Sequence, residues 1–164
     1  MLSTFERLLF IRRVSIFQEL RDEFLVKLAS AMDELSFPEH HTIFKQGEEG
    51  RSLYVVVSGR VRVYRGDLEL AQLEKGTFFG EMSLFDAEPR SASVTTLEEC
   101  DCLTLNQLQL IDAIEETPEI AVNITRALSR RIRELNDKIN DYEEQINDCE
   151  AQLKGTNLSR SREY

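Results

Sequence analysis

The sequence predicts an α+β fold in which a small antiparallel β-roll lies between helical segments. Apolar residues recur at three- and four-residue steps from Thr4 to Glu34, which is the helical period. Short β-rich runs then alternate with glycine turns up to Leu105, and six of the seven glycines lie in this stretch. Helical spacing returns after Leu105 and continues to Leu153. Together these observations predict helices on both sides of a jelly-roll-like body with tight corners.

Composition and charge limit the class of protein. The 164 residues suit one domain with an appended element, because compact domains usually hold about 100 to 150 residues. The formal net charge of -10 would repel a phosphate backbone, so direct nucleic-acid binding is not expected. The longest apolar run, Leu53–Val57, is far shorter than the roughly 20 residues of a membrane helix. Because residues 1–10 also lack a secretion signal, we expect a cytoplasmic location.

The first part of the chain is expected to hold two helices. Residues 15–21 interrupt the helical pattern, and Asp22 is a candidate cap for the second helix. Pro38 marks the change to the β-roll, and the adjacent His40 and His41 are expected to be solvated turn residues rather than a metal or pH-sensing pair. The predicted strands are Thr42–Lys45, Leu53–Val57, Arg60–Tyr64, Leu68–Leu73, Ser91–Thr96 and Asp101–Leu105.

The three cysteines are expected to be reduced thiols. They lack the CxxC spacing of a zinc site, so no metal is predicted. Cys100 and Cys102 are two residues apart on a predicted strand and therefore point to one face, where core packing is the simplest interpretation. Cys149 is expected to be a small core residue of a helical seam rather than a cross-link.

The end of the chain is predicted to form a long helix with a coiled-coil seam. After a helix at Gln107–Glu116, Thr117 and Pro118 are a start signal for the next helix. Its apolar residues then follow alternating four- and three-residue steps, the heptad spacing. The seam consists of Leu128, Ile132, Leu135, Ile139, Tyr142, Ile146, Cys149 and Leu153. Isoleucine at a positions with leucine at d favours a parallel homodimer, in which Lys138 faces Glu143 of the second copy.

The alternative is that this helix packs one face on the β-roll of its own chain. That arrangement suits the first turns through Leu128 but not a helix that reaches Leu153. The predicted organisation is therefore residues 1–117 as N-terminal helices and β-roll, residues 118–154 as the long helix, and residues 155–164 as a flexible tail.

A phosphate-site composition stands within the β-roll, in the stretch FFGEMSLFDAEPRSASV from Phe78 to Val94. Gly80 allows close backbone approach, and residues 81–84 suit a short helix whose amide groups favour an anion. Arg90 adds a planar fork of donors that matches phosphate oxygens, although a surface ion pair with Glu88 is the simpler alternative. Glu81 would then accept a hydrogen bond from a ribose hydroxyl, so that both halves of a nucleotide are recognised.

This stretch resembles the phosphate-binding cassette of the cyclic-nucleotide-binding domain family, which includes catabolite-activator-type regulators and kinase regulatory subunits. The resemblance extends upstream through TIFKQGEEGRSLYVVVSGRVRVY and covers most of residues 4–136. It implies that Gly80 and Glu81 hold the ribose 2′-hydroxyl and that Arg90 binds the exocyclic phosphate oxygens. The other candidates that it implies are Met82, Ser83, Ser91 and Ala92 at the phosphate, Val63, Leu70, Ala71 and Leu73 beside the base, and Leu135 and Asn136 at the adenine.

Two departures from the family pattern bear on the ligand. His41 stands where members often have a glycine, which is expected to alter a turn, and Leu135 replaces the hydroxyl side chain with which the catabolite activator contacts the base. The hydroxyl of Ser91 can contact the guanine amino group or the phosphate, and Ser91 therefore does not decide between the purines. Cyclic AMP is the expected ligand, with cyclic GMP as the alternative.

The resulting hypothesis is a non-enzymatic sensor that couples cyclic-nucleotide binding to rearrangement of the long helix. No nucleophile, base and orienting group are apparent, and no cofactor is expected. One alternative is a ligand-independent scaffold that acts through coiled-coil dimerisation. Another is a catabolite-activator-type transcription regulator truncated before its DNA-binding domain, because nothing after Leu153 suits such a domain.

Overall fold

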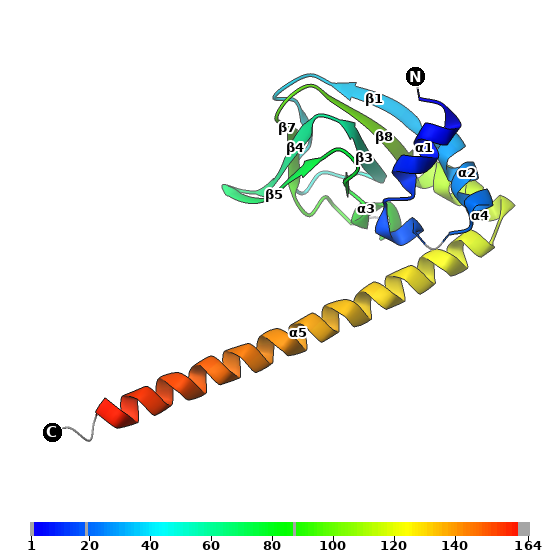
Figure 1. Cartoon of the computed structure of the whole chain (residues 1–164). Coiled ribbons are helices and arrows are strands. Elements are labelled where there is room, and N and C mark those ends of the chain that lie inside the picture. Colours follow the sequence, from blue (N-terminus) through cyan, green and yellow to red (C-terminus); the bar gives the residue numbers. More distant parts are fainter. Residues whose placement is uncertain (1, 19, 87, 161–164) are drawn as a thin grey trace. The chain divides into compact units, whose positions relative to one another are not determined.

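Within residues 2–18, 20–86 and 88–160, which the computed structural model describes, eight β-strands form two antiparallel sheets (Figure 1). One sheet has the order β1-β8-β3-β6, and the other has the order β2-β7-β4-β5. The strands are β1 Asp33–Phe37, β2 Thr42–Phe44, β3 Ser52–Ser58, β4 Arg60–Arg65, β5 Leu68–Glu74, β6 Phe78–Phe79, β7 Ser93–Thr96 and β8 Cys100–Asn106. The predicted antiparallel β-roll is thus confirmed.

The two sheets share an apolar core to which most strands contribute. Alternating side chains of each strand point to the same face, so residues two apart enter this core together. The buried cluster contains Phe44, Val56, Val61, Phe79, Val94, Cys100 and Cys102. Cys100 and Cys102 are free thiols whose sulfur atoms lie 3.8 Å apart. Their prediction as core-packing residues on one strand face is confirmed.

Strands β1 and β6 were not predicted from the sequence, and each has a physical reason. The helical prediction extended to Glu34, but helix α2 (Asp22–Ala31) ends earlier, and Asp33 pairs with Thr104 of β8. Strand β1 lies at the edge of its sheet and its side chains are largely exposed, so its sequence carries no apolar alternation. Strand β6 has only two residues, too few for any periodicity.

The helices of the first unit, Met1–Ile124, surround one end of the sheets. They are α1 Thr4–Ile11, the 3₁₀ turn η1 Ser15–Phe17, α2 Asp22–Ala31, α3 Met82–Phe85 and α4 Gln107–Glu116. The predicted break between two opening helices is confirmed, whereas Asp22 is the first helical residue and Arg21 occupies the cap position. Helix α1 begins with a capping box of Ser3 and Glu6, which satisfies backbone N–H groups at its first turn.

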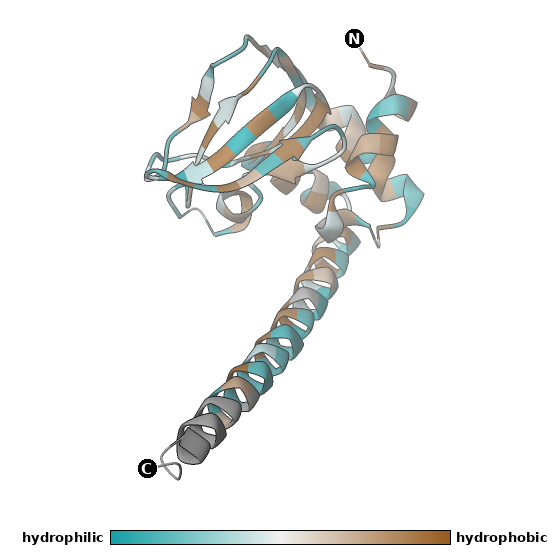
Figure 2. Ribbon diagram, turned by 60° about the vertical axis from the view of Figure 1, so that its left-hand side comes forward, coloured by the Kyte–Doolittle hydropathy of each residue, from teal (hydrophilic) through white to brown (hydrophobic). Residues whose placement is uncertain are grey.

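Helix α5 (Glu119–Arg160) begins in the first unit and forms the second, Thr125–Tyr164. Near its start, Ile120 and Ile124 are buried, whereas Val122 between them is half exposed. Farther along, apolar residues recur on an otherwise polar helix (Figure 2). The sequence predicts a frayed tail from Gly155, but the helix continues to Arg160. One glycine does not end a helix, because it costs only about 1 kcal/mol relative to alanine. Residues 161–164 of that predicted tail lie outside the described part.

The described residues form neither a membrane-spanning helix nor a metal-binding cluster. None of their helices combines the length and the apolar run needed to cross a bilayer. Among them, no group of three or more His, Cys, Asp or Glu side chains is placed to hold a metal ion.

Thr96 anchors the turn that joins β1 to β2. Its buried hydroxyl donates to the carbonyl of Pro38 at 2.7 Å and accepts from the amide of His41 at 2.8 Å. Its backbone carbonyl accepts from the amide of His40 at 3.1 Å. Of the described non-glycine residues, only His40 has a positive φ, at 58°, so the left-handed position of this turn falls on His40 rather than on His41.

We expect Thr96→Val to lower the free energy of unfolding by about 1–3 kcal/mol, because the turn's buried amide and carbonyl lose their hydroxyl partner. Urea denaturation followed by circular dichroism measures the change. Thr95→Val is the matched control, since among the described residues the half-buried Thr95 hydroxyl forms hydrogen bonds only with the hydroxyls of Thr42 and Tyr64. Equal losses in the two variants would contradict the anchoring role of Thr96.

Candidate functional site

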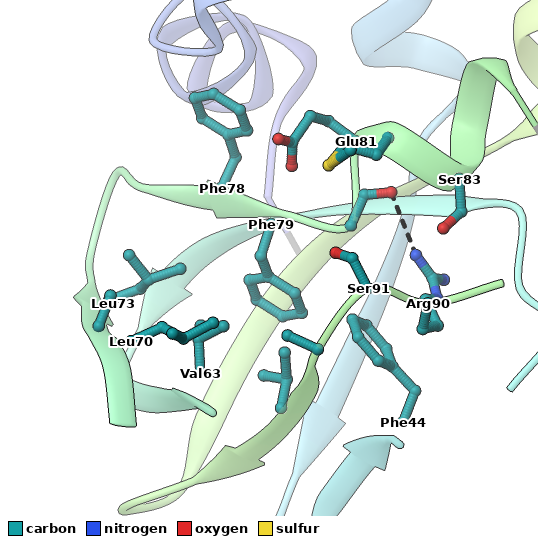
Figure 3. Close-up of a pocket in the computed structure, with 15 residues that line it drawn as sticks. Phe44, Val63, Leu70, Leu73, Phe78, Phe79, Glu81, Ser83, Arg90 and Ser91 are labelled. Atoms are coloured by element: carbon teal, nitrogen blue, oxygen red, sulfur yellow. Dashed lines mark hydrogen bonds between the residues drawn. The ribbon is translucent and has the colours of Figure 1, made fainter. Parts of the chain in front are cut away.

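A cavity of about 240 Å³ opens in the β-roll beside α3 (Figure 3). All eleven candidate residues that precede α5 line this cavity, so the structure brings together groups from three separate parts of the chain. They are Val63, Leu70, Ala71, Leu73, Gly80, Glu81, Met82, Ser83, Arg90, Ser91 and Ala92. Phe44, Phe78, Phe79 and Val94 also line it. Sequence reasoning missed these four, although the aromatic pair directly before Gly80 was a usable signal.

Arg90 forms the polar end of the cavity and is only 4% exposed. Its Nη1 donates to the carbonyl oxygens of Ser52 at 2.9 Å and Gly80 at 3.1 Å. The centre of its guanidinium lies 4.0 Å from the ring centroid of Phe44, a cation–π distance. The interpretation as a surface ion pair with Glu88 is therefore wrong, because this side chain is directed into the roll.

The charge of Arg90 is incompletely compensated. No described carboxylate lies within ion-pair distance of it, and its buried Nε has no hydrogen-bond partner in the described part of the chain. Burial lowers the pKa of Arg90, while Tyr54, Glu48 and Glu81 act in the opposite direction. Because arginine stays protonated in proteins, a buried cation lines this cavity, which favours an anion there.

The other end of the cavity is apolar. Val63 of β4 pairs with Ala71 of β5, and both residues line the cavity together with Leu70 and Leu73. Figure 3 shows this aliphatic group on the side of the cavity away from Arg90. A cavity with a cationic end and an aliphatic end fits a ligand that joins an anionic group to a flat apolar ring.

Gly80 and Glu81 connect β6 to α3 at the cavity wall. Gly80 has φ +79°, and a Cβ atom there would lie 2.7 Å from Nη1 of Arg90 and 2.8 Å from the carbonyl oxygen of Ser52. Glu81 is the half-buried residue before α3, and it lines the cavity (Figure 3). Because α3 has only four residues, its dipole is small, so Arg90 supplies the main positive charge beside the cavity.

Leu135 and Asn136 do not belong to this cavity lining. Both lie on α5 in the second unit. Their assignment to the base of a ligand stays a prediction, as do the individual binding roles of the cavity residues.

The comparisons with known proteins all identify relatives of the cyclic nucleotide-binding kind. The family model of the cyclic nucleotide-binding domain matches residues 34–117. The CRP-like cAMP-activated global transcriptional regulator of Mycobacterium tuberculosis is 33% identical over 131 residues, which are 77% of this chain and 58% of the regulator. The cyclic AMP receptor protein of Thermus thermophilus is 41% identical over 103 residues, which are 60% of this chain and 48% of the receptor. The chain thus spans about half the length of these relatives.

A solved structure shares the fold of most of the chain. The N-terminal domain of a transcriptional regulator from Streptomyces coelicolor superposes with a TM-score of 0.74 at 35% sequence identity. The match covers 79% of this chain and 94% of that domain. The two-sheet roll with its flanking helices is therefore an arrangement already observed by crystallography.

We expect Gly80→Ala to destabilise the protein more than Gly66→Ala, with unfolding free energies measured by urea denaturation. Both glycines have positive φ, so each alanine costs about 1–2 kcal/mol of backbone strain. A Cβ at Gly66 meets nothing within 4 Å, whereas at Gly80 it collides with Arg90 and the backbone of Ser52. Similar losses would show that close packing against Arg90 does not constrain position 80.

Proposed function

The chain belongs to the cyclic nucleotide-binding domain family, and on this premise we propose that it is a cyclic AMP sensor whose ligand fills the cavity beside α3. The observation that carries the proposal is the buried, charged Arg90 with a free Nε at one end of a cavity whose other end is aliphatic. A cyclic mononucleotide has the matching chemistry, a single negative charge on a cyclic phosphate and a planar base.

The proposed binding mode assigns each end of the nucleotide to one part of the cavity. Arg90 binds the exocyclic phosphate oxygens, and Glu81 accepts a hydrogen bond from the ribose 2′-hydroxyl. Val63, Leu70 and Leu73 pack against the base. The cavity volume of about 240 Å³ lies just below the range of roughly 300–1,000 Å³ that is usual for ligand sites, which favours one nucleotide over a cyclic dinucleotide.

Cyclic AMP is proposed over cyclic GMP on two grounds. Both relatives described above are named for cyclic AMP. The base end of the cavity is formed by aliphatic side chains, so it supplies no charged group for the extra polar atoms of guanine. In this proposal Leu135 and Asn136 of α5 cover the base, and ligand binding shifts the population of α5 arrangements.

The proposed role is regulatory binding rather than catalysis. The ionisable side chains that line the cavity are Glu81 and Arg90, which suit the holding of a phosphodiester. Cleavage would require an activated nucleophile and a general acid, and the lining supplies no histidine or cysteine for these tasks.

We expect Arg90→Ala to weaken cyclic AMP binding about tenfold to a hundredfold, because a charge-assisted contact contributes about 1.5–3 kcal/mol. Isothermal titration calorimetry with cyclic AMP, cyclic GMP and a cyclic dinucleotide measures the affinities. Arg60→Ala removes the same charge from an exposed position of β4, where Arg60 pairs with Glu98, and should bind like the wild type.

Two outcomes decide against parts of this proposal. Equal affinity of Arg90→Ala and the wild type would remove Arg90 from the phosphate site. An absence of binding by all three nucleotides would favour the alternative of a ligand-independent scaffold.

We also propose that α5 forms a parallel coiled-coil homodimer. Five seam residues, Ile132, Leu135, Ile139, Tyr142 and Ile146, are 49–62% exposed on the single chain. A helix with such a stripe at heptad spacing is stabilised when a second helix covers it. In the parallel register Lys138 faces Glu143 of the second copy, whereas an antiparallel register brings acidic e positions together. The side chain of Leu153, the last predicted seam residue, lies outside the described part.

Ile139→Asp should dissociate the dimer at micromolar concentrations, because it places two carboxylates in the apolar seam. Sedimentation velocity measures the molecular mass. Asn140→Asp introduces the same side chain one residue away, off the seam, and should remain dimeric. The exposed Cys149, a d residue, should form an interchain disulfide under mild oxidation if the helices are parallel and in register. A monomeric wild type would overturn this assignment.

A further inference from the structure

The guanidinium of Arg90 occupies a narrow slot formed by Gly50, Gly80 and the ring of Phe44. A Cβ atom at Gly50 would lie 2.5 Å from Nε of Arg90 and 2.8 Å from Nη2. A Cβ atom at Gly80 would lie 2.7 Å from Nη1, and the Phe44 ring covers one face at 4.0 Å. Both edges of the guanidinium are therefore in contact with positions that have no side chain.

In the slot, the N–H donors of Arg90 differ in their hydrogen bonding. Nη1 donates to two backbone carbonyl oxygens, those of Ser52 and Gly80. Nε faces the Gly50 backbone and has no hydrogen-bond partner in the described part of the chain. A buried donor without a partner is unfavourable, so this position of the side chain is a compromise that an arriving anion can relieve.

The Gly50 side of the slot is fixed by the preceding loop. The amide of Gly47 donates to the carbonyl of Arg90 at 2.8 Å, and the amide of Arg90 donates to the carbonyl of Glu48 at 2.9 Å. The amide of Gln46 donates to Oγ of Ser93 at 2.9 Å. Because these bonds tie the loop to the segment that carries Arg90, the loop cannot simply move aside for a larger residue at position 50.

We propose that Gly50 is a positioning residue for nucleotide recognition: its missing side chain lets Arg90 rest in the slot, in competition with the ligand's phosphate. The proposal rests on the proposed function of the cavity. In the slot Arg90 is hydrogen-bonded to carbonyls, and the phosphate has to draw the guanidinium toward the cavity to engage Nε. Gly50 thereby sets the fraction of molecules whose arginine is ready for the anion, and the apparent affinity scales with that fraction.

The surroundings of Arg90 indicate where its guanidinium would move if position 50 carried a side chain. A methyl group at position 50 excludes the guanidinium from its present place. Phe44 blocks one face, and Gly80 with the Ser52 carbonyl blocks the Nη1 end, so the open direction is the cavity that Arg90 already lines. Alanine at position 50 therefore favours the anion-ready position of Arg90.

We expect Gly50→Ala to bind cyclic AMP about three- to tenfold more tightly than the wild type, in line with a larger ready fraction. Its affinity for adenosine, which lacks the phosphate, should not change. Gly66→Ala is the control, because a Cβ atom there meets nothing within 4 Å. Calorimetry on the full chain measures both ligands. In the double variant Gly50→Ala, Arg90→Ala the gain should vanish, since it acts through Arg90.

The outcomes separate this inference from the function on which it rests. If the wild type binds cyclic AMP and Arg90→Ala weakens it, but Gly50→Ala is unchanged or weaker, the slot is overturned and the proposed function stands. If no variant binds a cyclic nucleotide, the proposed function itself is overturned.

A second measurement on the wild type covers the case in which Gly50→Ala fails to fold. The Nε–H proton of Arg90, assigned in nuclear magnetic resonance spectra by its loss in Arg90→Ala, should move downfield when cyclic AMP is added, because it gains an acceptor. A resonance that stays in place at saturation would overturn the slot.

Discussion

The buried positive charge of Arg90 is the constraint on which the rest of this structure depends. A guanidinium in an apolar roll needs acceptors, a flat surface and space, and each comes from a different segment. Carbonyl groups of Ser52 and Gly80 accept from it, and the ring of Phe44 covers it. Gly50 leaves space for it. Strands β2, β3 and β6 thus meet around one side chain, which explains why the turns beside them require glycine.

The two-ended character of the cavity follows from strand alternation. Val61 and Val63 of β4 share a face because they are two residues apart, and their partners Leu73 and Ala71 of β5 extend the same apolar surface. The connection from β6 through Gly80 to α3 brings Glu81 into the cavity lining. The cationic end and the aliphatic end of the cavity thereby come from different supersecondary elements, so a substitution at one end need not disturb the other.

Helix α5 differs from the roll in that most of its apolar side chains are exposed on the single chain. Ile120 and Ile124 near its start are buried in the first unit, and from Ile132 onward a regular apolar stripe is exposed. Helix propensity does not account for such a stripe, because it does not distinguish one face of a helix from another. The proposed homodimer would cover the stripe. Because Leu135 lies on this stripe and Asn136 lies next to it, a seam and a ligand contact on α5 would share neighbouring residues.

The sequence by itself determined the order of helices and strands from Thr42 to Leu105 apart from the two-residue strand β6, the buried cysteine pair and the residues of the cassette from Gly80 to Ala92. These features are local, since turn glycines, periodicity and donor chemistry act over a few residues. Only the tertiary structure decided that Asp33–Phe37 is a strand, because that polar edge segment is held by its pairing with β8. It also decided that Phe44 and Gly50 surround Arg90. Contacts between segments about forty residues apart produce no periodic pattern of apolar residues in the sequence. They can therefore be identified only from the folded structure, in which the two sheets pack together.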